Sequence, residues 1–204
     1  DLSKEIGNMV SVIRGIVPYI SVSTLRNAEK NAQTARTITR ELTFLFTDIR
    51  GFTTLCEGLN PKEVVSILNH YLDLETQIIL DNNGDVDKFV GDEMMAFFSG
   101  PRKGQNAGRA AIQIRNMMMK EREERLKQGK TIVSVGIGIN TGKVVFGSVG
   151  AKTRMDFTSI GDTVNLAARL EGANKAYGSK SIISEAVYTR LNGTFICREL
   201  DFIT

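Results

Sequence analysis

Hydrophobic side chains recur at alternating spacings of four and three along the first 17 residues, which is the period of a coiled-coil helix. Pro18 is expected to end or kink this helix, and a more polar helix is predicted to follow over residues 21–36. The segment forms either a packed N-terminal hairpin or, as we favour, a dimerising signal helix joined by a linker to the main domain. The apolar stripe consists of Leu2, Ile6, Met9, Ile13 and Ile16.

From residue 41 the pattern becomes that of a domain of helices and strands. Two long segments have the 3.6-residue hydrophobic period of amphipathic helices, and a third helix is predicted after them. Asn60-Pro61 is typical of a helix start, because proline suits the first helical position, and Asn82-Asn83-Gly84 is typical of a helix end. The predicted helices span residues 61–80, 106–127 and 162–177.

Strands are predicted around these helices. Gly91-Asp92 is a pair suited to a tight hairpin turn, and Thr141-Gly142 is expected to turn a second strand pair. The predicted strands span residues 42–46, 85–90, 94–98, 131–140, 143–149, 181–184 and 194–201. This order predicts an α/β layer fold with a ferredoxin-like βαββαβ core and additional strands, preceded by the N-terminal helices.

The composition is that of one globular domain. The chain has 204 residues, 42% of them hydrophobic, which suffices for a core without disulfides. The longest apolar run, residues 132–139, is far shorter than the ~18 residues of a membrane span. Two cysteines, Cys56 and Cys197, favour a reducing compartment. We expect a cytoplasmic domain and, because the chain does not begin with Met, a fragment; a membrane anchor in its parent protein stays open.

Charge is concentrated near the N-terminus. Residues 1–40 hold 6 basic and 3 acidic side chains, whereas residues 41–204 hold 20 of each, so the whole excess of +3 lies in the first segment. A neutral main domain lacks the basic stripe that binds phosphate backbones, which argues against nucleic acid as a partner. The single histidine, His70, excludes a histidine-rich metal site and is expected to be structural.

Two aspartates are candidate metal ligands. Asp48 ends a hydrophobic strand and precedes a small loop in which Gly51 lets the backbone approach a phosphate closely. Asp92 lies in the predicted hairpin turn, beside which the first strand is expected to pair, so the two carboxylates can converge. Carboxylates without histidine suit Mg²⁺ or Mn²⁺, and a pair of such ions catalyses displacement at phosphorus. For either aspartate alone, a capping or turn role is the simpler interpretation.

Three sequence blocks, at residues 46–53, 88–92 and 160–169, closely resemble the signatures of the class III adenylyl/guanylyl cyclase catalytic domain. The resemblance covers about residues 41–203 in the right order. It implies a catalytic domain over residues 41–204 whose C-terminal end is truncated. Residues 1–40 resemble the helical signal and dimerisation linker that precedes such domains, so an upstream sensor domain is expected in the parent protein.

The resemblance implies a role for each matched residue. Asp48 and Asp92 match the two aspartates that bind two Mg²⁺ or Mn²⁺ ions, and Ile49 matches the residue that lends a backbone carbonyl to one of them. Lys88 and Thr158 match the pair that selects the base. A lysine donates to adenine N1, whereas guanine carries an N–H there and opposes a donor.

The remaining matches concern the ribose and the phosphates. Asn165 matches the residue that orients the ribose, and Arg169 the one that stabilises the pentavalent transition state. Lys143 matches a position where some relatives carry a phosphate-binding arginine, and an exposed strand lysine is an equal alternative. Phe52 and Thr53 are candidate substrate-binding residues, because successive backbone N–H groups can cradle phosphate. The family's C-terminal phosphate-binding lysine has no counterpart, because the chain stops where that stretch would begin.

The implied activity is the conversion of ATP to cyclic AMP and pyrophosphate at a site shared by two subunits. One subunit supplies Asp48 and Asp92, and the other supplies Lys88, Thr158, Asn165 and Arg169. A homodimer therefore holds two equivalent sites. Three alternatives remain: a cyclase-homology domain that binds nucleotide without turnover, a guanylyl cyclase, which Lys88 disfavours, and a diguanylate cyclase, whose glycine-rich acidic signature is absent.

Overall fold

The computed structural model describes residues 2–21, 24, 37–151 and 153–202, so most of the predicted helix over residues 21–36 lies outside the described residues. The helices are α1 (Leu2–Ile16), the 3-10 turn η1 (Val17–Tyr19), α3 (Phe52–Glu57), α4 (Pro61–Asp81), α5 (Lys103–Lys127), α6 (Asp162–Tyr177) and α7 (Glu185–Leu191). The strands are β1 (Ile38–Ile49), β2 (Gly84–Val90), β3 (Glu93–Phe98), β4 (Val135–Ala151), β5 (Arg154–Ile160) and β6 (Ser181–Ile183).

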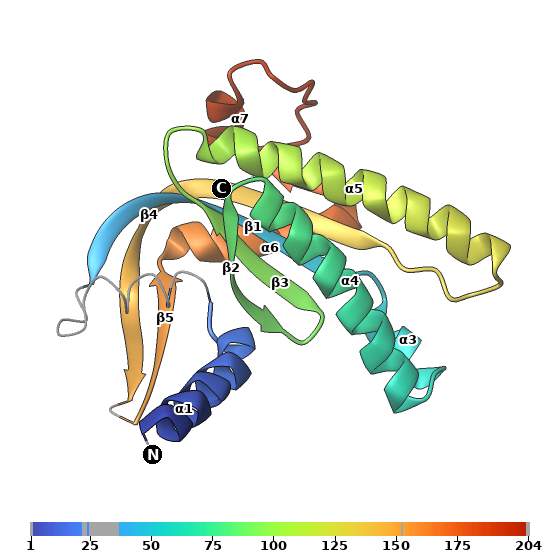
Figure 1. The fold of residues 1–204 in the computed structure, drawn as a ribbon. Helices are drawn as coiled ribbons and strands as arrows, with labels where there is room; N and C mark the ends of the chain where they lie inside the picture. Colours follow the sequence, from blue (N-terminus) through green and yellow to red (C-terminus); the bar gives the residue numbers. More distant parts are fainter. Residues whose placement is uncertain (1, 22–23, 25–36, 152, 203–204) are drawn as a thin grey trace.

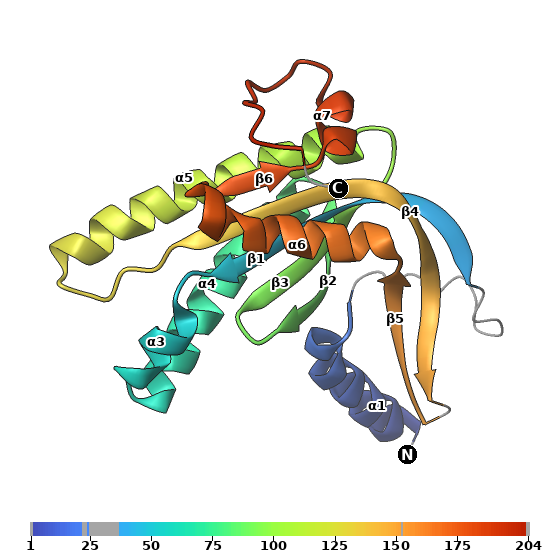
Figure 2. The ribbon, with the colours of Figure 1, turned by 180° about the vertical axis from the view of Figure 1, so that it is seen from behind.

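The sheet has the strand order β2-β3-β1-β4-β5, with β6 added parallel to β4 (Figures 1 and 2). Neighbouring strands along this path are antiparallel. The path from β1 through α4, the β2–β3 hairpin and α5 to β4 gives the βαββαβ core that the sequence predicts. The ferredoxin-like expectation is therefore confirmed.

Both faces of the central strands are buried, which explains the nearly continuous apolar run in β1. Leu45 and Ile49 face α4, α5 and α7, whereas Phe44 and Phe46 face α6. Figures 1 and 2 show α4 and α5 on one side of the sheet and α6 on the other. Alternate residues of one strand thus belong to two separate cores.

Helix α6 packs directly on β4, and glycines of the strand line the contact. A Cβ atom on Gly136 would overlap the side chains of Arg50 and Glu171, and one on Gly138 would overlap the α6 backbone. Only glycine leaves room for the helix at these two positions. The spacing of two residues puts both glycines on the same face of the strand.

The predicted turn at Thr141-Gly142 is wrong, since β4 runs unbroken through it. Both residues pair with β1, and the hydroxyl oxygens of Thr141 and Thr43 are 2.6 Å apart. The chain reverses only after Ala151 and then forms β5, which the sequence did not predict. Instead of two short strands, β4 is one long strand of 17 residues that continues past β1 to pair with β5.

The C-terminal prediction is also corrected. Residues 194–201 form no strand in the described part of the chain, and α7 takes the place before them. Ser184 caps α7 by accepting from the backbone N–H of Val187. Gly104 and Gly108 of α5 allow α7 to pack close to α5. A Cβ atom on Gly104 would be only 2.9 Å from Cβ of Arg190. A seven-residue helix that depends on such packing leaves little periodic signal.

Two helix boundaries agree with the predicted signals. Asn60 caps α4 in a reciprocal capping box with Glu63, followed by Pro61 at the first helical position. At the other end Asn83, with φ of 58°, makes the left-handed turn, while Gly84 already belongs to β2 and packs against the Phe98 ring. The asparagine therefore ends the helix and the glycine serves the strand pairing.

Helix α1 ends at the turn around Pro18, as predicted, and leaves its apolar stripe uncovered. None of its residues is buried, and Leu2 and Met9 are 73% and 64% exposed. Figure 1 shows α1 apart from the helices that cover the sheet. Among the described residues, no helix is both long and apolar enough to cross a membrane.

Candidate active site

The carboxylates predicted to bind metal come together at one end of the sheet. Asp48 lies near the end of β1, directly opposite Glu93 of β3, and Asp92 lies in the turn between β2 and β3. Gly91 in that turn has φ of 64°, which glycine adopts without strain. The hairpin and its antiparallel pairing with β1 therefore place the two aspartates side by side, as the element order predicts.

The electrostatics of this group are those of crowded acids. Burial, followed by repulsion from Asp92, raises the pKa of Asp48, and the positive charges of Arg50 and Lys175 oppose the shift. Burial and the same two aspartates also raise the pKa of Glu93. The three acids therefore hold more negative charge than their surroundings compensate.

An ion pair between Arg50 and Glu171 fixes the loop that follows Asp48. The Arg50 Nη2 to Glu171 Oε1 distance is 2.8 Å, and the same nitrogen donates to the Glu171 carbonyl at 3.2 Å. The backbone N–H of Arg50 donates to the carbonyl of Ser134 at 2.8 Å. Burial raises the pKa of Glu171 to about 7, with Arg50 opposing. The pair connects the loop that follows Asp48 to α6, and its two side chains lie against Gly136 of β4.

The donor set of this end suits a hard divalent cation. The described residues contain no cluster of three or more His, Cys, Asp or Glu side chains arranged for a metal. What the chain offers is two mutually repelling carboxylates, Asp48 and Asp92, next to the backbone of Ile49, whose side chain is buried in the core. Oxygen donors of this kind match Mg²⁺ and Mn²⁺, and a bound cation would relieve the repulsion.

A second cluster forms around Asp87, which lies next to Lys88 in β2. A β-bulge between Val86 and Lys88 shifts the strand register at this point. Asp87 Oδ2 accepts a hydrogen bond from Thr158 Oγ1 at 2.8 Å and lies 3.4 Å from Lys88 Nζ. Lys88 and Thr158, the predicted base-selecting pair, are therefore brought together by the carboxylate between them.

The edge strands β2 and β5 meet here although they lie at opposite ends of the strand order. The sheet curls because the second half of β4 bends over α6 (Figure 2). An aromatic contact between Phe146 of β4 and Phe157 of β5, with ring centroids 4.7 Å apart, holds the curled part. Phe146 also packs against Phe97 of β3 at 5.4 Å.

Asn165 and Arg169 lie one turn apart on α6, on the same side, and both side chains are exposed. Lys175, whose charge acts on Asp48, and Glu171, on which Asp48 acts, lie on the other side of the helix. Within one chain, therefore, α6 presents Arg169 away from the aspartates of that chain.

The predicted site residues form two groups that are separate within the chain. The metal-end group contains Asp48 and Asp92, and the base-end group contains Lys88 and Thr158 with Asp87 between them. The charges that act on Asp48 are those of Asp92, Arg50 and Lys175, and those that act on Asp87 are Lys88 and Asp156. Throughout the described ranges, no hydrogen bond or ion pair joins Asp48 or Asp92 to Lys88, Thr158, Asn165 or Arg169. Within one chain the predicted site residues thus form two disconnected groups.

Comparison with known proteins identifies the family. A model of the family described as the adenylate and guanylate cyclase catalytic domain matches residues 35–203. The chain belongs to this family. It is 41% identical over 178 residues to an adenylate cyclase of Anabaena cylindrica, a match that covers 85% of this chain and 35% of that protein. The chain therefore spans about a third of the length of this relative.

Solved structures of cyclases share the fold. The adenylyl cyclase CyaB from P. aeruginosa is 38% identical with a TM-score of 0.73, over 80% of this chain and 86% of that one. A bacterial light-regulated adenylyl cyclase has a TM-score of 0.85 at 28% identity, over 93% of this chain and 56% of that one. The class III cyclase fold expected from the sequence motifs is confirmed.

The remaining predicted residues are placed as follows. Phe52 and Thr53 begin the short helix α3, where the Phe52 side chain packs against the core and Thr53 is exposed. Lys143 lies within β4 rather than beside a turn, and its side chain is exposed while its carbonyl accepts from Thr163 Oγ1 at 2.9 Å. The phosphate-binding roles of these residues remain predictions.

Sequence reasoning missed Asp87, Arg50 and Glu171. Asp87 and Arg50 are direct neighbours of Lys88 and Ile49, so adjacency to a predicted site residue was an available signal. Glu171 has no such signal, since it is far from Arg50 in the chain and its role depends on the approach of α6 to β4.

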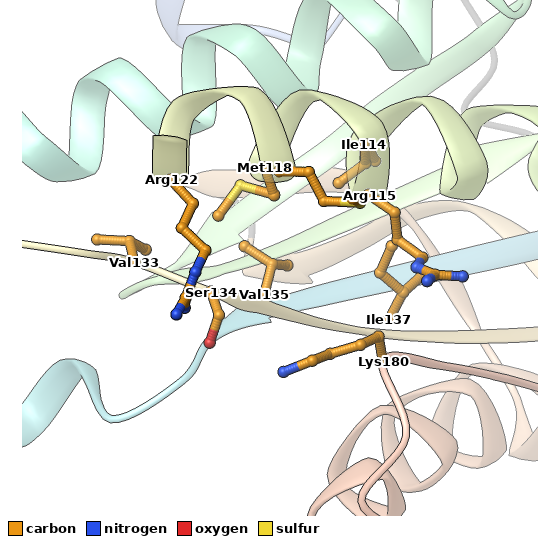
Figure 3. Close-up of a pocket in the computed structure, with 10 residues that line it drawn as sticks. Ile114, Arg115, Met118, Arg122, Val133, Ser134, Val135, Ile137 and Lys180 are labelled. Atoms are coloured by element: carbon orange, nitrogen blue, oxygen red, sulfur yellow. The ribbon is translucent and has the colours of Figure 1, made fainter. Parts of the chain in front are cut away.

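An apolar pocket of about 210 Å³ lies away from both groups, between α5 and β4 (Figure 3). The residues that line it include the apolar Ile114, Met118 and Val135 and the basic Arg115 and Lys180. None of the predicted site residues lines it, so this pocket is separate from the predicted site.

Proposed function

We propose that this chain is the catalytic domain of an adenylyl cyclase that converts ATP to cyclic AMP and pyrophosphate. The observation that carries the choice of ATP is the convergence of Lys88 and Thr158 on Asp87. A lysine next to a hydroxyl offers a donor to adenine N1 and an acceptor to the adenine amino group. Guanine carries the opposite pattern at both atoms, which disfavours GTP.

In the proposed reaction the ribose 3′-oxygen forms a bond to the α-phosphorus, the bond from that phosphorus to the pyrophosphate oxygen breaks, and the hydroxyl proton leaves to solvent. Two Mg²⁺ or Mn²⁺ ions held by Asp48, Asp92 and the Ile49 carbonyl would supply activation of the hydroxyl and stabilisation of the leaving group. Asn165 orients the ribose. Arg169 places positive charge where negative charge develops at phosphorus.

The two groups are proposed to complete each other across a homodimer. Their separation within one chain supports this assembly, because the metal-end group of one subunit can face the base-end group of the other. A two-fold axis then gives two equivalent sites. The uncovered apolar stripe of α1 supports a role for residues 1–40 in pairing the subunits. An upstream sensor in a longer parent protein is consistent with the greater length of the relatives.

The test is to incubate the protein with ATP or GTP and Mn²⁺ or Mg²⁺, and to measure cyclic nucleotide and pyrophosphate. We expect cyclic AMP and pyrophosphate in equal amounts from ATP, and at most a trace of cyclic GMP. Nucleotide binding without product would identify a cyclase-homology domain, and a preference for GTP would identify a guanylyl cyclase. The double variant Lys88→Glu, Thr158→Cys should weaken the use of ATP, because it inverts the donor and acceptor pattern.

A further inference from the structure

The Asp87 side chain is buried and contacts the neighbouring Lys88, although adjacent residues of a regular strand point to opposite faces. Successive residues of a strand alternate between its two faces, yet the β-bulge lets the Asp87 carboxylate reach the Lys88 ammonium. The Asp87 side chain is 0% exposed, whereas that of Lys88 is 37% exposed. A buried acid at a bulge, between two base-selecting residues, has no role in the reaction as described so far.

The carboxylate determines which way the Thr158 hydroxyl points. Thr158 Oγ1 donates its proton to Asp87 Oδ2, because an ionised carboxylate only accepts. Burial raises the pKa of Asp87, and the hydrogen bond from Thr158 and the positive charge of Lys88 oppose this shift by stabilising the carboxylate. With its one proton engaged, Thr158 can offer only lone pairs to a ligand.

The second carboxylate oxygen of Asp87 also favours Thr158 as the acceptor and Lys88 as the donor. Asp87 Oδ1 is buried and has no hydrogen-bond partner among the residues that the structure describes. Its lone pairs add negative potential beside Thr158 and leave the Lys88 ammonium as the local donor. The cluster therefore presents one donor and one acceptor in a fixed order.

We propose that Asp87 is a positioning residue that sets purine selection, by holding the Thr158 hydroxyl as an acceptor and the Lys88 ammonium as a donor. The proposal rests on the proposed function, since it assigns the third member of the base-selecting site. A 6-aminopurine with an unprotonated N1 fits this order, whereas a 6-oxopurine with N1–H opposes both groups. Selection thus depends on a residue that acts through its two neighbours.

The test compares ATP with inosine triphosphate, which differs from ATP only in the 6-oxo group and the N1 proton. Asp87→Asn keeps the size of the side chain, but its amide can donate to Thr158 and so releases the hydroxyl proton. We expect the ratio of kcat/KM for ATP to that for inosine triphosphate to fall about tenfold or more. Asp156→Asn is the matched control, since Asp156 lies two residues from Thr158 and is exposed; its ratio should not change.

A second background separates positioning from a general structural effect. In Thr158→Val, which has no hydroxyl to orient, Asp87→Asn should change the ratio much less than it does in the wild type. If Asp87→Asn fails to fold, as judged by circular dichroism and Tm, Asp87→Ala is measured in its place. A folded variant whose ratio stays within about twofold of the wild type, in either substitution, would overturn the proposal.

The two proposals fail differently. A wild-type protein that forms no cyclic AMP contradicts the proposed function, and the same ratio is then taken from calorimetric Kd values for ATP and inosine triphosphate. A preference for ATP that is lost in Asp87→Asn supports the role of Asp87 in binding. A preference that Asp87→Asn leaves unchanged contradicts it, whether or not the protein turns over.

Discussion

Two groups of acidic residues in this chain differ in how their charge is compensated. At the metal end, Asp48 and Asp92 repel each other, and Glu93 adds a third acid. At the base end, Asp87 is buried but accepts from Thr158 and pairs with Lys88. An uncompensated acid pair is suited to binding a cation, whereas a compensated acid keeps fixed donors and acceptors in place.

The largest effect is expected at the uncompensated end. Asp48→Asn or Asp92→Asn should lower cyclic AMP formation by at least ~10³-fold, because each substitution removes a proposed ligand of both metals. Glu93→Gln is the matched control, since this acid lies in the same field but is not a proposed ligand; it should cost less than about tenfold. Initial rates with saturating Mn²⁺ measure both. If an aspartate variant keeps more than a tenth of the wild-type rate, the two-metal assignment is wrong.

The separation of the two groups is tested by mixing variants. Asp48→Asn spoils the metal end of both sites in its homodimer, and Arg169→Ala spoils the other half of both. A mixed dimer has one site with both lesions and one intact site, so random mixing should restore roughly a quarter of the wild-type activity. Cyclic AMP formation is measured after subunit exchange. No recovery, with exchange confirmed through a tagged subunit, would place the whole site within one chain.

The connection between the metal end and α6 is tested at Gly136. Gly136→Ala should displace the Arg50–Glu171 pair, and overpacking of this kind costs ~1–3 kcal/mol of unfolding free energy. Gly172→Ala is the matched control on α6, because nothing lies within 4 Å of the added Cβ, and it should be neutral or slightly stabilising. Urea unfolding measures both, together with the rate at saturating ATP. Equal stability of the two variants would show that Gly136 is not needed for close packing.

A smaller effect is expected from Glu75, a buried acid behind the metal end. Its Oε2 accepts from Thr47 Oγ1 at 2.5 Å, and burial raises its pKa from the usual 4.5 to about 7. Between these values the folded state binds more protons than the unfolded state, so stability falls as pH rises through this window. Glu75→Gln should reduce the loss of unfolding free energy between pH 5 and pH 8 by up to ~3 kcal/mol.

Urea unfolding at both pH values measures the Glu75 effect. The comparison is the difference between the two pH values within each protein, because the glutamine amide itself changes the stability at every pH. Asp81→Asn serves as the control, since Asp81 is an exposed acid of the same helix. An unchanged pH dependence in Glu75→Gln would show that Glu75 titrates normally.

Local sequence signals predicted the parts of the fold that local physics controls. The start of α4 at Asn60-Pro61, the 3.6-residue periods of α4 and α5, and the bounds of α6 follow from short-range rules. Convergence of Asp48 and Asp92 also followed, because a βαββ order puts the hairpin beside the first strand. The turn at Thr141-Gly142 was mispredicted, since pairing with β1 overrides the turn tendency of these residues.

The sequence by itself determined the family and the core topology and predicted which residues carry the chemistry, because motifs and hydrophobic periods lie in neighbouring positions of the chain. Only the tertiary structure decided that Asp87 joins Lys88 to Thr158 and that Glu171 reaches Arg50. The first contact needs the β-bulge in β2 and a curled sheet that brings its two edge strands together. The second needs α6 to pack against Gly136 and Gly138 of β4. Such contacts join residues 71 and 121 positions apart, beyond the range of any local pattern.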